Sequence, residues 1–144
     1  MAPPTDREIS NLIQDVVDAS KRPPKARHTS IKPTVASLVS LAYDRGLLPA
    51  ALDDLIDLVT TPNHLDQASL ASIVRNLYPV ASVSTNVVLR VVSSLGHGEL
   101  KPSLNVQAAL LRWLILIYHV IETPAVLSQC FQVLFNLLDT AAYR

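Results

Sequence analysis

The pattern of hydrophobic and polar positions along the chain is that of a series of amphipathic helices. In segment after segment, apolar residues recur at three- and four-residue intervals, which places them on one face of an α-helix. The segments with this pattern are about 6–20, 33–45, 49–60, 65–77, 84–95, 103–122 and 124 onward. We therefore predict an all-α protein of about seven helices.

Several residues mark where these helices should begin and end. Thr5 followed three residues later by Glu8 is a capping-box pattern, which predicts the start of the first helix. Pro33 and Pro49 suit first-turn positions, because proline lacks the N–H that would be unpaired there. Gly46 directly follows a helical stripe and is expected to stop that helix.

The segment 80–96 is ambiguous, because its many valines favour a strand. The same valines also fit one face of a helix, with Ser84 as its cap and Gly96 as its stop. Its neighbours are all helical, and a lone hairpin would lack partner strands. We therefore predict a helix here.

The most apolar stretch is Ser103–Glu122, whose few polar residues fall along one narrow edge of a helix. A helix that is hydrophobic almost all round must be covered on several sides, by protein or by lipid. Arg112 near the centre argues against a membrane span, at a cost of roughly 2.5 to 3.5 kcal/mol. We expect this helix to be sandwiched between others, with Trp113 in the core.

The spacing of the helices predicts an α-solenoid of HEAT-like antiparallel pairs. Two interleaved series of helix starts recur at roughly 32 to 40 residues, close to the HEAT and armadillo range. The two series begin near Pro33, Leu65 and Ser103, and near Pro49, Ser84 and Pro124. Because no sequence repeat accompanies this period, a compact helical bundle stays open as the alternative.

We expect residues 1–144 to form a single helical-repeat domain. The last helix runs to Arg144 without a terminating glycine, which predicts the N-terminal piece of a longer protein. Inside the domain, residues 21–32 form a basic linker that contains two adjacent prolines. A nuclear-targeting or phosphate-contacting patch is one interpretation of the linker. A solvated connector is the interpretation we favour.

Composition and charge narrow the functional classes. The formal net charge is zero, so there is no global electrostatic case for binding nucleic acid or an anionic membrane. The single cysteine, Cys130, excludes an internal disulfide framework and fits an intracellular compartment. It falls within an apolar stripe, where we expect a buried, inert thiol.

The sequence indicates no catalytic residue, metal ligand set or cofactor site. Asp53, Asp54 and Asp57 lie on one side of an amphipathic helix, where carboxylates most often face water. Gly96-His97-Gly98 lacks the preceding strand and the following lysine of a phosphate-binding loop. We therefore expect no enzyme. A deep pocket holding two titratable groups with shifted pKa values would change that expectation.

Two segments resemble a known family. The run LLRWLILIYHVIE at 110–122 and VLFNLLD at 133–139 are similar to the N-terminal region of the centromere protein I family. The matching features are the Leu110-x-x-Trp113 spacing, the aliphatic run behind it and the final Leu-Phe-Asn-Leu-Leu-Asp. The resemblance implies a HEAT-like, non-enzymatic scaffold at the inner kinetochore, in the nucleus. It also implies docking of the centromere protein H and K pair.

The partner-binding residues are expected on the polar face of the second helix of each pair, if those helices line the groove of the solenoid. These residues are Asp53, Asp57, Asn86, Arg90, Gln132 and Asn136. The alternative is that they simply face water. Arg112 and His119 are expected to pair with a carboxylate of a neighbouring repeat, or to extend to the surface. A helical adaptor that binds short peptides in trafficking or signalling is the competing function.

Overall fold

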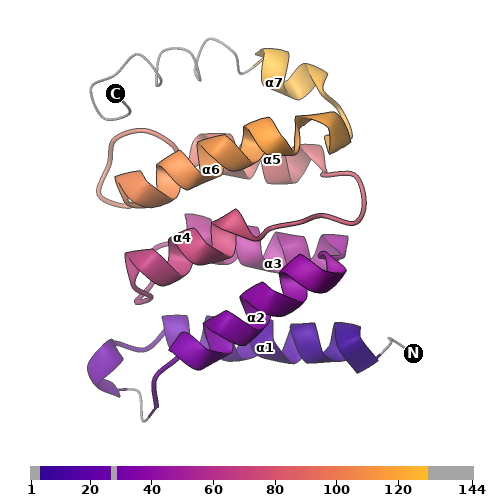
Figure 1. The fold of residues 1–144 in the computed structure, drawn as a ribbon. Coiled ribbons are helices and arrows are strands. Elements are labelled where there is room, and N and C mark those ends of the chain that lie inside the picture. The colour runs from indigo at the N-terminus through magenta and orange to yellow at the C-terminus, as the bar shows by residue number, and fades with distance from the viewer. Residues whose placement is uncertain (1–3, 27–28, 130–144) are drawn as a thin grey trace.

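The computed structural model describes residues 4–26 and 29–129, and this part of the chain is a series of helices joined by connectors (Figure 1). Its elements are α1 (Pro4–Ser20), η1 (Pro24–Ala26), α2 (Lys32–Arg45), α3 (Pro49–Thr60), α4 (Gln67–Arg75), α5 (Thr85–Ser93), α6 (Leu104–Leu116), η2 (Tyr118–Val120) and α7 (Ala125–Gln129). The elements marked η are single 3-10 turns. The described residues contain no strand beyond two isolated β-bridges.

The helices form two rows. In the first, which we call the odd row, α1 contacts α3, α3 contacts α5 and α5 contacts α7. In the second, the even row, α2 contacts α4 and α4 contacts α6. Figure 1 shows the resulting stack, with α2 crossing in front of α1 and α6 in front of α5. A stack built from successive helix pairs is the architecture of an α-solenoid. The predicted solenoid is therefore confirmed, and the alternative of a compact bundle is not.

The hydrophobic core lies between the two rows and runs the length of the stack. Each helix from α1 to α6 contributes a side chain that is at most 1% exposed: Val16, Leu38, Ile56, Val74, Val88 and Leu110. These residues belong to one continuous cluster. Burial of apolar surface contributes about 25 cal/mol per Å², so this shared core is the main source of stability.

Backbone hydrogen bonds join the connectors at one edge of the stack. Leu47, between α2 and α3, donates its N–H to the carbonyl of Tyr78 (2.7 Å) and accepts from the N–H of Val80 (3.0 Å). Gly46 makes this close approach possible. Its φ is +76°, and a Cβ built there would lie 2.2 Å from Cγ1 of Val80. Gly46 also ends α2, as the sequence predicts.

The next pair of connectors repeats this arrangement. Val83, which is fully buried, donates its N–H to the carbonyl of Val120 (2.7 Å) and accepts from the N–H of Glu122 (2.8 Å). The chain between α6 and α7 is thereby joined to the chain between α4 and α5. The connectors of successive repeats thus share backbone hydrogen bonds as well as buried side chains.

Serine and aspartate caps set the starts of three helices. The side chains of Asp66, Ser84 and Ser103 accept hydrogen bonds from the N–H groups three residues ahead, at 3.0, 3.3 and 3.4 Å. The cap at Ser84 opens α5, so the helix predicted for this valine-rich segment is confirmed. The end of α5 differs from the prediction. The last helical residue is Ser93, and the C-cap is Ser94 rather than Gly96.

Other boundaries differ from the sequence prediction. α1 already begins at Pro4, so Thr5 lies inside the helix and the expected N-cap there is wrong. α4 is shorter than predicted at both ends. Asp66 rather than Leu65 sets its start, and at its end the side chain of Asn76 donates to the carbonyl of Ser72 (2.8 Å).

The apolar stretch at 103–122 is not one helix. α6 ends at Leu116, because Ile117 leaves helical geometry with ψ near 8° and the chain turns through η2 toward Val83. Trp113 and Ile117 are buried, as expected. However, Ile115 and Leu116 are 75% and 66% exposed, so the prediction that this helix is covered nearly all round is wrong.

Two further expectations concern the basic linker and the end of the chain. Within the basic linker, residues 21–26 are exposed, and the choice between a solvated connector and a targeting patch stays a prediction. The continuation of the last helix past Gln129, with Cys130, lies outside the described residues.

The indole of Trp113 joins two repeats through a buried hydrogen bond. Its Nε1–H donates to the carbonyl of Leu77 at 2.7 Å. We expect Trp113→Phe to lower the free energy of unfolding by about 1–3 kcal/mol, because the buried carbonyl loses its donor. Urea denaturation followed by circular dichroism measures the change. Tyr78→Phe, at an exposed ring, is the control and should cost little. Equal stability of the two variants would contradict this role for the indole.

Candidate interaction surface

The sequence-predicted partner-binding residues lie on the outer side of the odd row. Asp53 and Asp57 are on α3, and Asn86 and Arg90 are on the contacting helix α5. All four are exposed. The structure therefore brings these residues onto neighbouring helices of one row. The remaining two, Gln132 and Asn136, lie outside the described residues.

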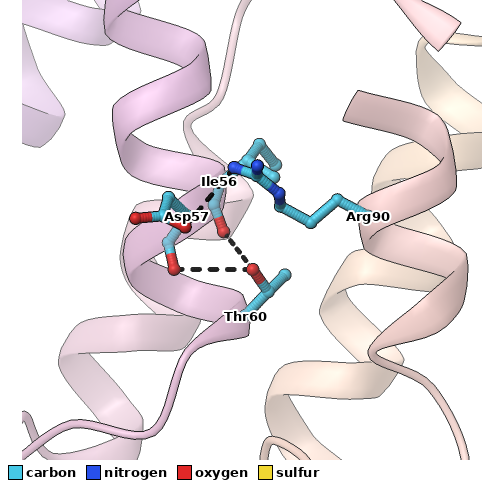
Figure 2. A network of polar contacts seen from close by, with 4 residues as sticks. All are labelled: Ile56, Asp57, Thr60 and Arg90. Atoms are coloured by element: carbon cyan, nitrogen blue, oxygen red, sulfur yellow. Dashed lines mark hydrogen bonds and ion pairs between the residues drawn. The ribbon is translucent and has the colours of Figure 1, made fainter. Parts of the chain in front are cut away.

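Two of these residues pair with each other across the helix junction. A guanidinium nitrogen of Arg90 lies 3.4 Å from a carboxylate oxygen of Asp57, with side chains 49% and 66% exposed (Figure 2). Beside them, the hydroxyl of Thr60 donates to the carbonyl of Ile56 at 2.6 Å. The helical period of the sequence places Asp57 and Arg90 on polar faces. Their pairing depends on how α3 and α5 pack, which the sequence does not show.

Two open hollows flank Asp57. One, of about 330 Å³, lies where α1 meets the end of α3 and is lined by residues that include Lys21, Asp54 and His64. The other, of about 460 Å³, lies between the ends of α3 and α5 and includes Arg90 and Lys101. Both hollows carry charges of both signs at a solvent-facing surface.

The titratable groups of the described residues form no reactive constellation. The pKa of Asp66 lies below its usual range, first because the hydroxyl of Ser69 donates a hydrogen bond to its carboxylate. This carboxylate is the N-cap of α4, so the shift belongs to a structural role. Within residues 4–26 and 29–129, no group of three or more His, Cys, Asp or Glu residues could hold a metal ion. In the same part of the chain, no helix is long and apolar enough to cross a membrane.

The prediction that Arg112 and His119 lie along one edge of a single helix is wrong. Arg112 lies exposed on α6, whereas His119 lies in η2, beyond the end of that helix. No ion pair joins either residue to a carboxylate among the described residues. Trp113, by contrast, is a core residue as predicted.

Gln107 is a structural polar residue whose role the sequence did not reveal. Gln107 lies on α6, is 1% exposed, and forms hydrogen bonds with the loop before that helix. Its Nε2 donates to the carbonyls of Gly96 (3.0 Å) and Pro102 (2.9 Å), and its Oε1 accepts from the N–H of Gly96 (2.9 Å). The available signal was one amide on the apolar side of a helix, next to a glycine-containing loop.

We expect the Asp57–Arg90 pair to contribute little to stability. An exposed ion pair typically contributes about 0.2–1 kcal/mol, and salt screens it. A double-mutant cycle with Asp57→Asn and Arg90→Gln should give a coupling free energy in that range, falling as salt is raised. Chemical denaturation of the four proteins measures it. A coupling well above this range would show that the pair is a structural link between α3 and α5.

Comparison with known proteins places this stack in a defined group. The family described as CENP-I: Mis6 matches residues 8–143. The inner kinetochore subunit mis6 of Schizosaccharomyces pombe is 30% identical over 105 residues, which is 72% of this chain and 16% of that protein. The chain thus spans a small part of the length of this relative.

Two solved structures are similar over nearly all of the chain. One is a chain in the crystal structure of the kinetochore subunits Cenp-H/I/K triple complex, with 54% identity and a TM-score of 0.90. The other is the crystal structure of centromere protein Cenp-I, with 54% identity and a TM-score of 0.89. Both cover 94% of this chain and 64% of the solved one.

Proposed function

This chain belongs to the CENP-I/Mis6 family, and from that premise we propose that it is a non-enzymatic scaffold domain of the inner kinetochore, in the nucleus. In this role it docks helical segments of two partner subunits of the Cenp-H and Cenp-K type. The observation that carries the proposal is the 54% identity over 94% of the chain to a protein solved in the Cenp-H/I/K triple complex. The resemblance noted at 110–122 is confirmed by the family match.

The fold supports a scaffold role. A solenoid offers long surfaces of side-by-side helices, onto which a partner helix or coiled coil can be laid. Here the two rows present such a surface on each side of the stack. The open, charged hollows beside Asp57 suit side chains of a macromolecular partner better than an enclosed small molecule.

We propose the outer face of the odd row as one contact surface for these partners. Asp53 and Asn86 are the residues on this face that we expect to contact the partners first, because both are exposed on adjacent helices. Asp57 and Arg90 already pair with each other, so a partner would have to share or replace that interaction. Gln132 and Asn136 belong to the same proposed set.

The direct test is reconstitution with the C-terminal helical parts of the two partner subunits from the same organism. We expect the chain and the pair to elute together in size-exclusion chromatography at micromolar concentration. Separate elution at that concentration would overturn the proposed function. The experiment needs only the purified proteins and distinguishes a scaffold from a free-standing domain.

Substitution tests the odd-row surface within the same assay. Asp53→Lys with Asn86→Lys should weaken binding of the pair by about tenfold, because the charge and shape of the contact change. The control is Thr29→Lys with Ser30→Lys, on the exposed connector before α2. Isothermal titration calorimetry measures both. Equal affinities would remove the odd row from the contact and leave the scaffold function in place.

A further inference from the structure

The two rows of the solenoid carry opposite charge, although the chain is neutral overall. In the odd row, the helices hold the acidic residues Glu8, Asp15, Asp18, Asp53, Asp54 and Asp57 and the basic residues Arg7 and Arg90. In the even row, the helices hold the basic residues Lys32, Arg45, Arg75 and Arg112 against the acidic residue Asp44. The helices of the odd row are therefore predominantly acidic, and those of the even row predominantly basic.

The outer face of the even row also carries small side chains. Its outward positions on the three helices include the small residues Ala36, Ser40, Ala68 and Ala108, all exposed. Small side chains allow the backbone of a second helix to approach closely. Arg75, at the end of α4, and Arg112, within α6, extend from this face, and neither has an ion pair with another described residue.

An exposed aromatic pair lies at the edge of this face. The rings of Tyr43 and Tyr78 meet edge to face, with centroids 5.6 Å apart and planes at 80°. Tyr43 is 68% exposed, and Ile115 on α6 is 75% exposed. Tyrosine and arginine are among the residues enriched at protein interfaces, because each combines apolar area with hydrogen bonding.

We propose that this even-row face, which carries Arg75, Arg112 and the Tyr43–Tyr78 pair, docks an acidic amphipathic helix of a partner subunit. The inference rests on the proposed scaffold function and adds a second contact surface, opposite the odd row. The sign of the charge selects the partner segment: carboxylates of the helix meet the two guanidinium groups, and its apolar side meets the tyrosines and Ile115. Arginine binds carboxylates through paired hydrogen bonds, which fixes the register of the docked helix.

A protein helix suits this face better than nucleic acid. Double-stranded DNA carries about one negative charge per 1.7 Å, and its binding normally uses a dense basic patch. The even-row helices carry few basic residues, spread over α2, α4 and α6 and accompanied by Asp44. The exposed apolar groups beside the arginines add contact area that a phosphate backbone would not use.

Charge reversal tests the proposal in the reconstituted complex. Arg75→Glu with Arg112→Glu should weaken binding of the partner pair at least about tenfold, and the remaining binding should depend less on salt. The matched control reverses two exposed basic residues of the linker between α1 and α2, Arg22→Glu with Lys25→Glu, and should bind as the parent does. Thermal melting of all three proteins checks that each is folded.

Two further arms make the result decisive. Tyr43→Ser should weaken binding severalfold without changing its salt dependence, because it removes apolar contact and no charge. Replacing glutamates or aspartates of the partner segment by lysine should restore binding to the Arg75→Glu, Arg112→Glu variant. This rescue would assign the acidic helix directly to the even row.

The outcomes separate the two proposals. If the parent chain does not bind the pair, the scaffold function fails. If the parent binds and the even-row variant binds as tightly as its control, the scaffold function stands and the even-row inference is overturned. Binding of a duplex DNA probe that Arg75→Glu with Arg112→Glu abolishes, with partner binding unchanged, would also overturn it.

Discussion

The structure depends on the burial of apolar surface between successive helix pairs. No pair can cover its own hydrophobic faces, so each requires the next pair along the stack. The core residues from Val16 to Leu110 form one continuous cluster for this reason, and the connectors follow the same logic. Leu47 and Val83 are buried at the edge, and each exchanges backbone hydrogen bonds with the corresponding connector of the next repeat. Stability and shape therefore have the same origin, which is the repetition of one interface.

This constraint explains what the sequence could and could not predict. Local signals identified most of the helices: Ser84 caps α5, Ser103 caps α6 and Gly46 ends α2. The period of the helix starts indicated a solenoid because each row repeats the same packing. The end of α6 was missed, since it is set by hydrogen bonds from Val83 to a segment almost 40 residues later along the chain. Interactions of that kind leave no periodic trace.

The candidate surface was predicted only in part, for a related physical reason. The helical period placed Asp53, Asp57, Asn86 and Arg90 on polar faces, and the fold puts them together on one row. The helical period could not show that Asp57 and Arg90 pair, because the pairing depends on the relative position of α3 and α5. Nor could a net charge of zero reveal two rows of helices with opposite charge. Charge became informative only when the helices were sorted into rows.

The contact between Trp113 and Leu77 has a practical consequence. The sequence contains one tryptophan, and its ring lies at the junction where α6 packs on the end of α4. Indole fluorescence is sensitive to hydration and to hydrogen bonding at the ring nitrogen. The emission spectrum of the unlabelled protein therefore reports the state of a single inter-repeat junction. Loosening of that junction, by heat, by denaturant or by a docked partner, is visible in solution without any added dye.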